Sequence, residues 1–171
     1  YPRLCEDFYN RDVLTVAPEL IGKTLVRNYG DSLNRYTILE TEAYRGEQDQ
    51  ASHARFGRTY RNSIMYARGG LVYVYLIYGM YWMLNVVTGP IEMPQAILIR
   101  GLAGLAGPGI LTRALVIDRS FYGEDLVTSN RLWIENSYLK PAISHTPRIG
   151  IPYAGEPWKS RAWRFIAVSV C

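Results

Sequence analysis

Tyr36–Tyr44 reads Tyr-Thr-Ile-Leu-Glu-Thr-Glu-Ala-Tyr. The stretch is rich in β-branched and aromatic residues, so it is predicted to be a strand. Side chains alternate between the two faces of a strand. One face then carries Tyr36, Ile38, Glu40, Glu42 and Tyr44, and the other carries Thr37, Leu39, Thr41 and Ala43. Two acids and two tyrosines on one face are more typical of the wall of a functional site than of a core.

The flanking sequence adds further strands and few helices. A short helix is predicted around Val13–Leu20, ending at Gly22, and another over Leu111–Ile117. Further strands are predicted at 23–27, 71–78, 80–87, 95–100 and 160–170, with a turn at 30–32. The run 71–78 is nearly all apolar and is expected to be buried on both faces. Because the strands mostly follow one another without repeated β-α-β alternation, the predicted fold class is α+β.

Length and composition indicate one ordinary globular domain. A chain of 171 residues, without repeats or long linkers, is predicted to form a single domain over residues 1–171. The formal net charge of +4 and the pI near 9.1 favour an anionic partner. The positive charge is concentrated: His53–Arg68 contains four arginines and no Asp or Glu.

Cysteine usage and hydropathy indicate an intracellular protein. Cys5 and Cys171 lack the spacing of a zinc site; two free thiols are expected, with a bridge between the ends as the alternative. Tyr1–Asn10 has charges and no apolar core, so no signal peptide is expected. The uncharged run Leu71–Val87 is shorter than the ~20 apolar residues of a spanning helix and contains Gly79 and several tyrosines. No membrane association is therefore expected.

Glu42 and His53 are the first candidates for chemistry. A carboxylate on a strand with aromatic neighbours can act as a general base on water, its pKa tuned by partial burial. A surface acid paired to an arginine is the alternative for Glu42. His53 is one of only two histidines, and an ordinary structural histidine is the alternative there. Neither residue alone identifies a site.

A group of tyrosines favours a pocket for a nucleobase. The strands are expected to bring together Tyr44, Tyr73, Tyr75, Tyr78 and Tyr81. Stacking on an aromatic ring contributes ~1–3 kcal/mol per base, so two or three rings offset the few kcal/mol needed to extrude a nucleotide. Arginines beside the pocket would hold the phosphates. Core packing of the tyrosines and a solvated basic loop are the alternatives.

These residues resemble a known family, the alkyladenine (3-methyladenine) DNA glycosylases of base-excision repair. The similarity runs from about Leu14 to Phe165. Its most specific pieces are Leu39–Tyr44, Ala51–His53, Arg61–Asn62, Tyr73–Met80, Asn85–Val87 and Gly107–Gly109. The resemblance implies a single mixed domain around a curved, mostly antiparallel sheet, similar to the C-terminal domain of formyltransferases.

The resemblance also implies catalytic roles. Glu42 matches the general base that activates the water attacking the sugar C1′. Arg100 matches the arginine that helps to hold that water, which would account for a charge after the apolar run Ala96–Ile99. Monofunctional excision without strand cleavage is implied.

DNA-contacting roles follow from the same resemblance. Tyr44, His53 and Tyr75 match the walls between which the flipped base stacks, and Asn85 matches a residue of the pocket floor. Tyr78 matches the wedge that intercalates where the base has left. Arg58 and Arg61 fall where the family places cations on the DNA backbone.

Three positions depart from the family pattern. Tyr60 stands where a proline is usual before Arg-Asn, so that loop is expected to be less rigid. Ile110 follows Gly107–Gly109 where a lysine is common. The segment between Arg100 and Gly107 is shorter than usual by roughly two dozen residues.

The expected function is a DNA N-glycosylase that excises damaged purines, alkylated adenine first and deaminated purines second. The expected partner is double-stranded DNA containing such bases, bound by a monomer that is associated with DNA inside the cell. No metal and no organic cofactor is expected, since there is no Cys/His cluster and no Gly-rich phosphate loop. A non-catalytic nucleic-acid-binding module of the same fold is the main alternative, and a small-nucleotide hydrolase is a weaker one.

Overall fold

A computed structural model describes residues 1–168. The helices are α1 (Glu6–Tyr9), α2 (Val13–Glu19) and α3 (Pro108–Ala114). The strands are β1 (Thr24–Asn28), β2 (Leu33–Arg45), β3 (Val72–Ile77), β4 (Tyr81–Thr88), β5 (Gln95–Leu102), β6 (Leu105–Ala106), β7 (Leu132–Glu135), β8 (Ile143–Thr146) and β9 (Arg164–Ala167). All the pairings of these strands are antiparallel. The predicted α+β class with few helices is confirmed.

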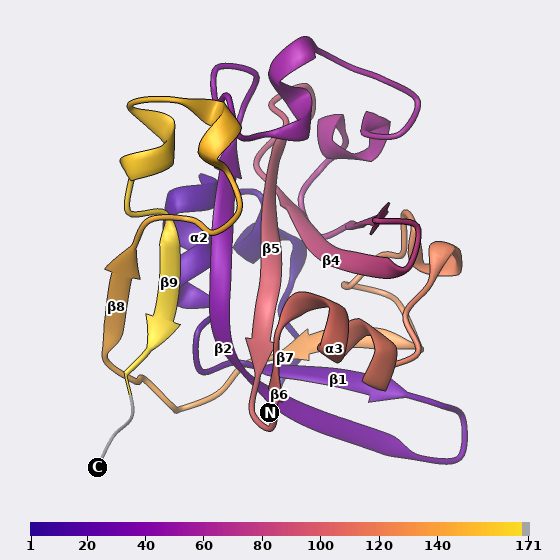
Figure 1. The fold of residues 1–171 in the computed structure, drawn as a ribbon. Coiled ribbons are helices and arrows are strands. Elements are labelled where there is room, and N and C mark those ends of the chain that lie inside the picture. The colour runs from indigo at the N-terminus through magenta and orange to yellow at the C-terminus, as the bar shows by residue number, and fades with distance from the viewer. Residues whose placement is uncertain (169–171) are drawn as a thin grey trace.

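The long strand β2 organises the sheet. The strand order is β3-β4-β5-β2-β1-β7, with β6 beside β5 and the pair β8 and β9 attached to β2. The first part of β2 pairs with β1, and its second part pairs with β5 and β9. Its register against β5 shifts at Glu40, and β2 changes partners there. Figure 1 shows the resulting bend, with β1 and β7 running across the lower end of the upright strands β2 and β5. Such irregularities re-aim side chains near functional sites.

The two faces of β2 have different roles. Helix α2 is preceded by Asp12, whose side chain caps it by accepting a hydrogen bond from the Leu14 amide. It packs behind the sheet (Figure 1), where Thr41 donates a 3.0 Å hydrogen bond to the Ala17 carbonyl. Thr41 and α2 lie on the core side of the sheet. By alternation, Glu42 and Tyr44 face the opposite side.

Several predicted boundaries were right and others need correction. The helix before Gly22 is α2, and Gly22 has a φ of +89° that favours glycine. The helix predicted at 111–117 begins earlier, at Pro108, because proline suits the first turn of a helix. The strand predicted at 160–170 is only Arg164–Ala167, and residues 169–170 of it lie outside the described residues.

The expectation that 71–78 is buried on both faces was wrong for its second half. Val72–Val74 is buried, but Leu76 is 40% exposed and Tyr78 is 85% exposed. Strand β3 is at the edge of the sheet. The 123–124 segment contacts only its beginning: the Val72 amide donates to the Glu124 carbonyl, and the Val72 carbonyl accepts from the Gly123 amide. Strands β6, β7 and β8 and helix α1 were not predicted.

Two further expectations concern the membrane and the cysteines. In residues 1–168 no helix has the length and apolar character needed to cross a bilayer. Cys5 is a free, exposed thiol. Cys171 lies outside the described residues, so its pairing stays a prediction.

Candidate active site

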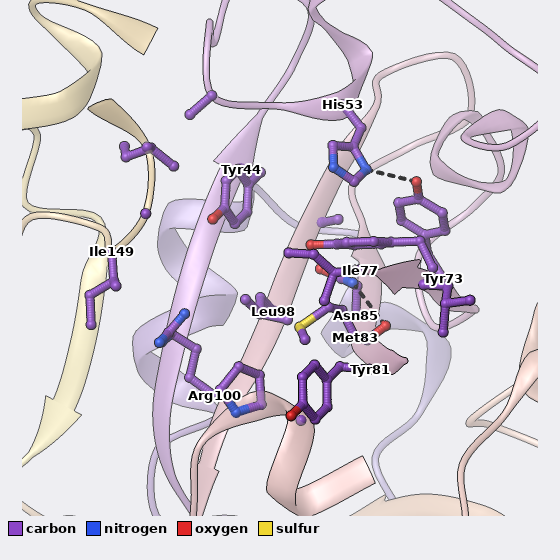
Figure 2. A pocket seen from close by; sticks show the side chains of 18 of the residues that line it. Tyr44, His53, Tyr73, Ile77, Tyr81, Met83, Asn85, Leu98, Arg100 and Ile149 are labelled. Atoms are coloured by element: carbon purple, nitrogen blue, oxygen red, sulfur yellow. Dashed lines mark hydrogen bonds between the residues drawn. The ribbon is translucent and has the colours of Figure 1, made fainter. Parts of the chain in front are cut away.

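A cavity of about 800 Å³ opens on the face of the sheet opposite α2. Strands β2, β3, β4 and β5 form its base through Tyr44, Tyr75, Asn85, Leu98 and Arg100. Two segments that are far apart in the sequence close its sides, one containing His53 and one containing Ile149 (Figure 2). The predicted aromatic side chains therefore do share one concave surface.

Glu42 lies directly beneath this cavity and is fully buried. Its Oε1 accepts a 3.0 Å hydrogen bond from the Tyr44 hydroxyl, and its Oε2 accepts one of 2.7 Å from the Ile149 amide. Arg100 Nη1 is 3.5 Å from Oε1. Tyr44, Arg100 and Ile149 all line the cavity. The carboxylate is thus held by three groups that separate it from the open space.

The environment of Glu42 raises its pKa. Burial has the largest effect and favours the neutral acid. The positive charge of Arg100 and the hydrogen bonds from Ile149 and Tyr44 act in the opposite direction. The net increase poises the carboxyl to exchange a proton at a pH closer to neutrality than an exposed glutamate would.

Arg100 is shared between two acids. Its Nε donates to Glu40 Oε1 at 3.3 Å while its Nη1 approaches Glu42. Glu40 Oε1 also accepts from Arg164 Nε at 2.5 Å. Glu40 is therefore already neutralised by two guanidinium groups, whereas Glu42 is the acid under the cavity. The structure thus distinguishes Glu40 from Glu42, whereas the alternation of side chains along the strand only places both on the same face.

The three residues predicted to form the base-binding walls, Tyr44, His53 and Tyr75, all line the cavity. His53 and Tyr75 are in contact, with ring centroids 4.3 Å apart, so they form one side of the cavity and leave no space between them. Tyr44 lies across the cavity from His53 in Figure 2. His53 Nδ1 shares a 2.8 Å hydrogen bond with the Tyr73 hydroxyl. Burial, followed by the charges of Arg61 and Arg55, lowers the pKa of His53 to about 4, so the ring is neutral at physiological pH.

The cavity floor is small and apolar around one amide. Asn85 is 3% exposed, and its Nδ2 donates to the Met83 carbonyl at 3.4 Å. Met83 and Leu98 lie beside it (Figure 2). The side-chain oxygen of Asn85 has no hydrogen-bond donor among the described residues within the usual distance. A base that lies on this floor would have to donate a hydrogen bond to the side-chain oxygen of Asn85 or leave that oxygen without a partner.

Tyr78 stands at the tip of the hairpin that joins β3 to β4. The Met80 amide donates to the Ile77 carbonyl at 3.1 Å, and Tyr78 and Gly79 have φ of +54° and +66°. Positive φ is unfavourable for tyrosine. The turn nevertheless holds the ring outside, 85% exposed, at the edge of the cavity. An exposed ring at this position is compatible with the intercalating role that the family resemblance implies for Tyr78, which stays a prediction.

The Gly107–Gly109 motif closes the lower end of the cavity. Gly107 has a φ of +115°, Pro108 begins α3, and all three residues line the cavity. A Cβ on Gly109 would lie 2.9 Å from the ring of Tyr81. Glycine is thus required for α3 to approach β4 this closely.

Two of the four arginines of the 53–68 segment are already paired with acids. Arg58 pairs with Glu92 at 2.5 Å, and Arg68 pairs with Asp125 at 2.7 Å. Of the two predicted backbone-contacting residues, only Arg61 lines the cavity. Glu92 and Asp125 lie outside the segment, so a count of charges within 53–68 does not show that they neutralise two of its arginines.

Comparisons with known proteins give the cavity its context. The family model for methylpurine-DNA glycosylase matches residues 7–169. The chain is 42% identical to a protein of Methanocella arvoryzae over 96% of this chain and 92% of that protein. It is 46% identical to one of Anaeromyxobacter dehalogenans over 95% and 82%, and 42% identical to one of Psychrobacter cryohalolentis over 87% and 84%. All three relatives are named, by inference, 3-methyladenine DNA glycosylases.

The chain belongs to the methylpurine-DNA glycosylase family. The predicted family resemblance is therefore confirmed, and the matched range contains every residue that lines the cavity. The individual roles of Glu42, Arg100 and the aromatic walls remain proposals.

Sequence reasoning missed the segment that covers Glu42 in this glycosylase. Arg148 forms a fully buried ion pair with Asp49, with Nη1 to Oδ2 at 2.6 Å, and also donates to the Ala43 carbonyl. This pair fixes the position of the next residue, Ile149, whose amide reaches Glu42. The contact joins residues 107 positions apart. Without a local motif, nothing in the sequence indicates that pairing.

Proposed function

We propose that this protein is a monofunctional DNA N-glycosylase that flips out alkylated purines and hydrolyses their N-glycosidic bond. The observation that carries the proposal is Glu42, a buried carboxylate with a raised pKa beneath an aromatic cavity and beside Arg100. A module that only bound nucleic acid would gain nothing from a buried acid facing an anionic polymer. The names of the relatives support DNA as the partner.

The cavity suits an extruded purine. The base would enter between Tyr44 on one side and His53 and Tyr75 on the other. Stacking contributes ~1–3 kcal/mol per base on such rings. Many alkylated purines are cationic, and a cation is attracted to the electron-rich faces of tyrosine. The neutral His53 ring adds no opposing charge of its own.

Glu42 would act as the general base. Because Tyr44, Arg100 and Ile149 separate Glu42 from the cavity, the attacking water would have to lie between these groups, where Arg100 would help to orient it. The water oxygen forms a bond with C1′ while Glu42 accepts a proton from it. The C1′–N bond breaks, its electron pair leaves with the base, and a cationic purine departs neutral. Because a deaminated purine such as hypoxanthine needs leaving-group protonation as well, it is expected to react more slowly.

The reaction would end at an abasic site. A glycosylase that also cuts the strand uses an amine to form a Schiff base with the sugar. The lysines Lys23, Lys140 and Lys159 are absent from the lining of the cavity, which supports simple hydrolysis. A monomer acting on double-stranded DNA inside the cell is proposed.

Base release from defined duplexes tests the function. The protein is incubated with duplexes that contain 3-methyladenine, 7-methylguanine, hypoxanthine or normal purines, and released bases and abasic sites are counted. Release of alkylated purines by the wild type, and not by Glu42→Gln, is the expected result. Retention of every base, with duplex binding intact, would favour the binding module. Borohydride trapping of a protein–DNA adduct would contradict the monofunctional mechanism.

A further inference from the structure

The guanidinium of Arg61 covers part of the aromatic wall. Its Nη2 is 3.2 Å from both Nδ1 and Nε2 of His53. An atom in the ring plane at that distance from both nitrogens would collide with the carbon between them. Nη2 therefore lies over the face of the imidazole. Arg61 Cζ is also 5.5 Å from the centroid of the Tyr75 ring, within the range of a cation–π contact.

This contact places a flat cation on the two rings that form one proposed base-stacking wall. Arg61, His53 and Tyr75 all line the same cavity. A guanidinium and a cationic alkylated purine share planarity and positive charge, so they suit the same aromatic surface. A base that stacks there competes with Arg61 for it.

The side chain of Arg61 can leave without disturbing its backbone. The Arg61 carbonyl accepts a 3.0 Å hydrogen bond from the Tyr122 hydroxyl. The neighbouring Asn62 is 1% exposed and donates to the carbonyls of His53 and Gly57. By contrast, the guanidinium forms no ion pair with a carboxylate in residues 1–168, unlike Arg58 with Glu92. A change of rotamer releases it.

We propose that Arg61 is a displaceable plug of the base pocket, which a DNA phosphate draws away from His53 and Tyr75. Without DNA, the plug lowers the affinity of the pocket for free purines. When DNA is present, the guanidinium exchanges a weak aromatic contact for a charge-assisted phosphate contact. Opening of the wall is thereby coupled to engagement of the backbone, so that the pocket selects bases that belong to DNA. The proposal rests on the proposed function for the identity of the pocket.

The position of Arg61 can be followed by NMR in the whole protein. Protons of a guanidinium stacked on aromatic rings are shifted upfield by the ring currents. We expect the Arg61 Nε–H and Cδ protons to resonate upfield in the free protein and to return to ordinary values when an undamaged duplex is added. Ordinary shifts in the free protein, or upfield shifts that persist on DNA, would overturn the plug. This readout needs no catalytic activity.

Affinity for the free base 3-methyladenine gives the second test. This probe has neither phosphate nor sugar and is not consumed. A cation–π contact at an exposed site corresponds to about two- to fivefold in affinity, so Arg61→Ala is expected to bind the base about two- to fivefold more tightly than the wild type. Arg119→Ala removes the same charge from an exposed residue that does not line the cavity, and should bind as the wild type does.

The outcomes distinguish a plug from two other roles for Arg61. Unchanged affinity in Arg61→Ala would indicate that the residue serves only phosphates, and reduced affinity would make it part of the binding wall; either result refutes the plug. Absence of base binding by all three proteins would count against the proposed purine pocket. In that case the ring-current shift of Arg61 still decides whether the contact exists and is released by DNA.

Discussion

The Ile149 amide donates a 2.7 Å hydrogen bond to Glu42 Oε2 across 107 positions of sequence. The other oxygen of the carboxylate is held by Tyr44 and lies near Arg100. Both oxygens are therefore oriented before any substrate arrives. In the proposed mechanism, this arrangement fixes the direction in which the remaining lone pairs of Glu42 point, and so the position of the attacking water.

The excision rate should fall on the acid side at a pH above the ordinary glutamate pKa of 4.5. The base must be ionised to accept a proton, and burial favours its neutral form. Arg100→Gln removes the charge that lowers the pKa, so the acid limb should move to still higher pH. Single-turnover rates across pH 4–9 measure both shifts. An Arg100→Gln limb that coincides with that of the wild type would refute this electrostatic role.

The pH dependence of the free energy of unfolding gives an independent test of the raised pKa of Glu42. The folded pKa of Glu42 is raised, so the native state holds its proton more tightly than the unfolded chain does. Stability should then decrease as pH rises from about 4.5 through the raised pKa, and stay level above it. Glu42→Gln should lack this decrease. Chemical denaturation of the two proteins at several pH values compares them directly.

The parts of the fold that could be predicted are those with local signals. Alternation identifies β2, the turn around Tyr78-Gly79 ends β3, and Gly22 follows α2. The period-two pattern also places Glu42 and Tyr44 together on the face that carries the cavity. These features depend on near neighbours in the chain.

The parts that could not be predicted depend on long-range pairing. The edge position of β3, which exposes Leu76, follows from the order of strands and not from the apolar run. The partner of Arg58 is Glu92, the partner of Arg68 is Asp125, and the partner of Arg148 is Asp49. Each acid lies in another segment, so a count of charges along 53–68 overstates the free positive charge.

Tyr78→Ala should impair excision of a paired lesion more than that of a mismatched one. The ring stands free at a turn whose positive φ holds it outward, so it can replace the departed base in the stack. Loss of stacking worth ~1–3 kcal/mol predicts roughly a five- to 150-fold lower rate for the paired lesion and a smaller loss for one that is already unpaired. Single-turnover rates on the two duplexes test this. An equal loss on both would place Tyr78 in the pocket wall.

Arg58→Ala should weaken binding to all duplexes alike and reduce the salt slope by about 1 if Arg58 contacts a phosphate. In the free protein this guanidinium is paired with Glu92, which must release it. Glu92→Gln should therefore raise duplex affinity by about 1.4- to fivefold, since an exposed ion pair contributes roughly 0.2–1 kcal/mol. Titrations at several salt concentrations measure both. A change in base preference with an unchanged slope would contradict the phosphate contact.

Glu42→Gln should retain lesion binding and lose excision by about 10²–10⁴-fold, because an amide keeps the shape of the side chain and cannot accept the proton of water. Glu40→Gln should cost no more than roughly tenfold, since its amide oxygen can still accept from Arg100 and Arg164. The two variants differ by one position on the same strand face, and each removes one negative charge, so each is the control for the other. Parallel single-turnover assays, with binding measured on the same duplex, show which of the two carboxylates is the general base and which only supports it. If Glu40→Gln were inactive and Glu42→Gln active, the base would be Glu40, and the burial of Glu42 beneath Tyr44, Arg100 and Ile149 would be structural.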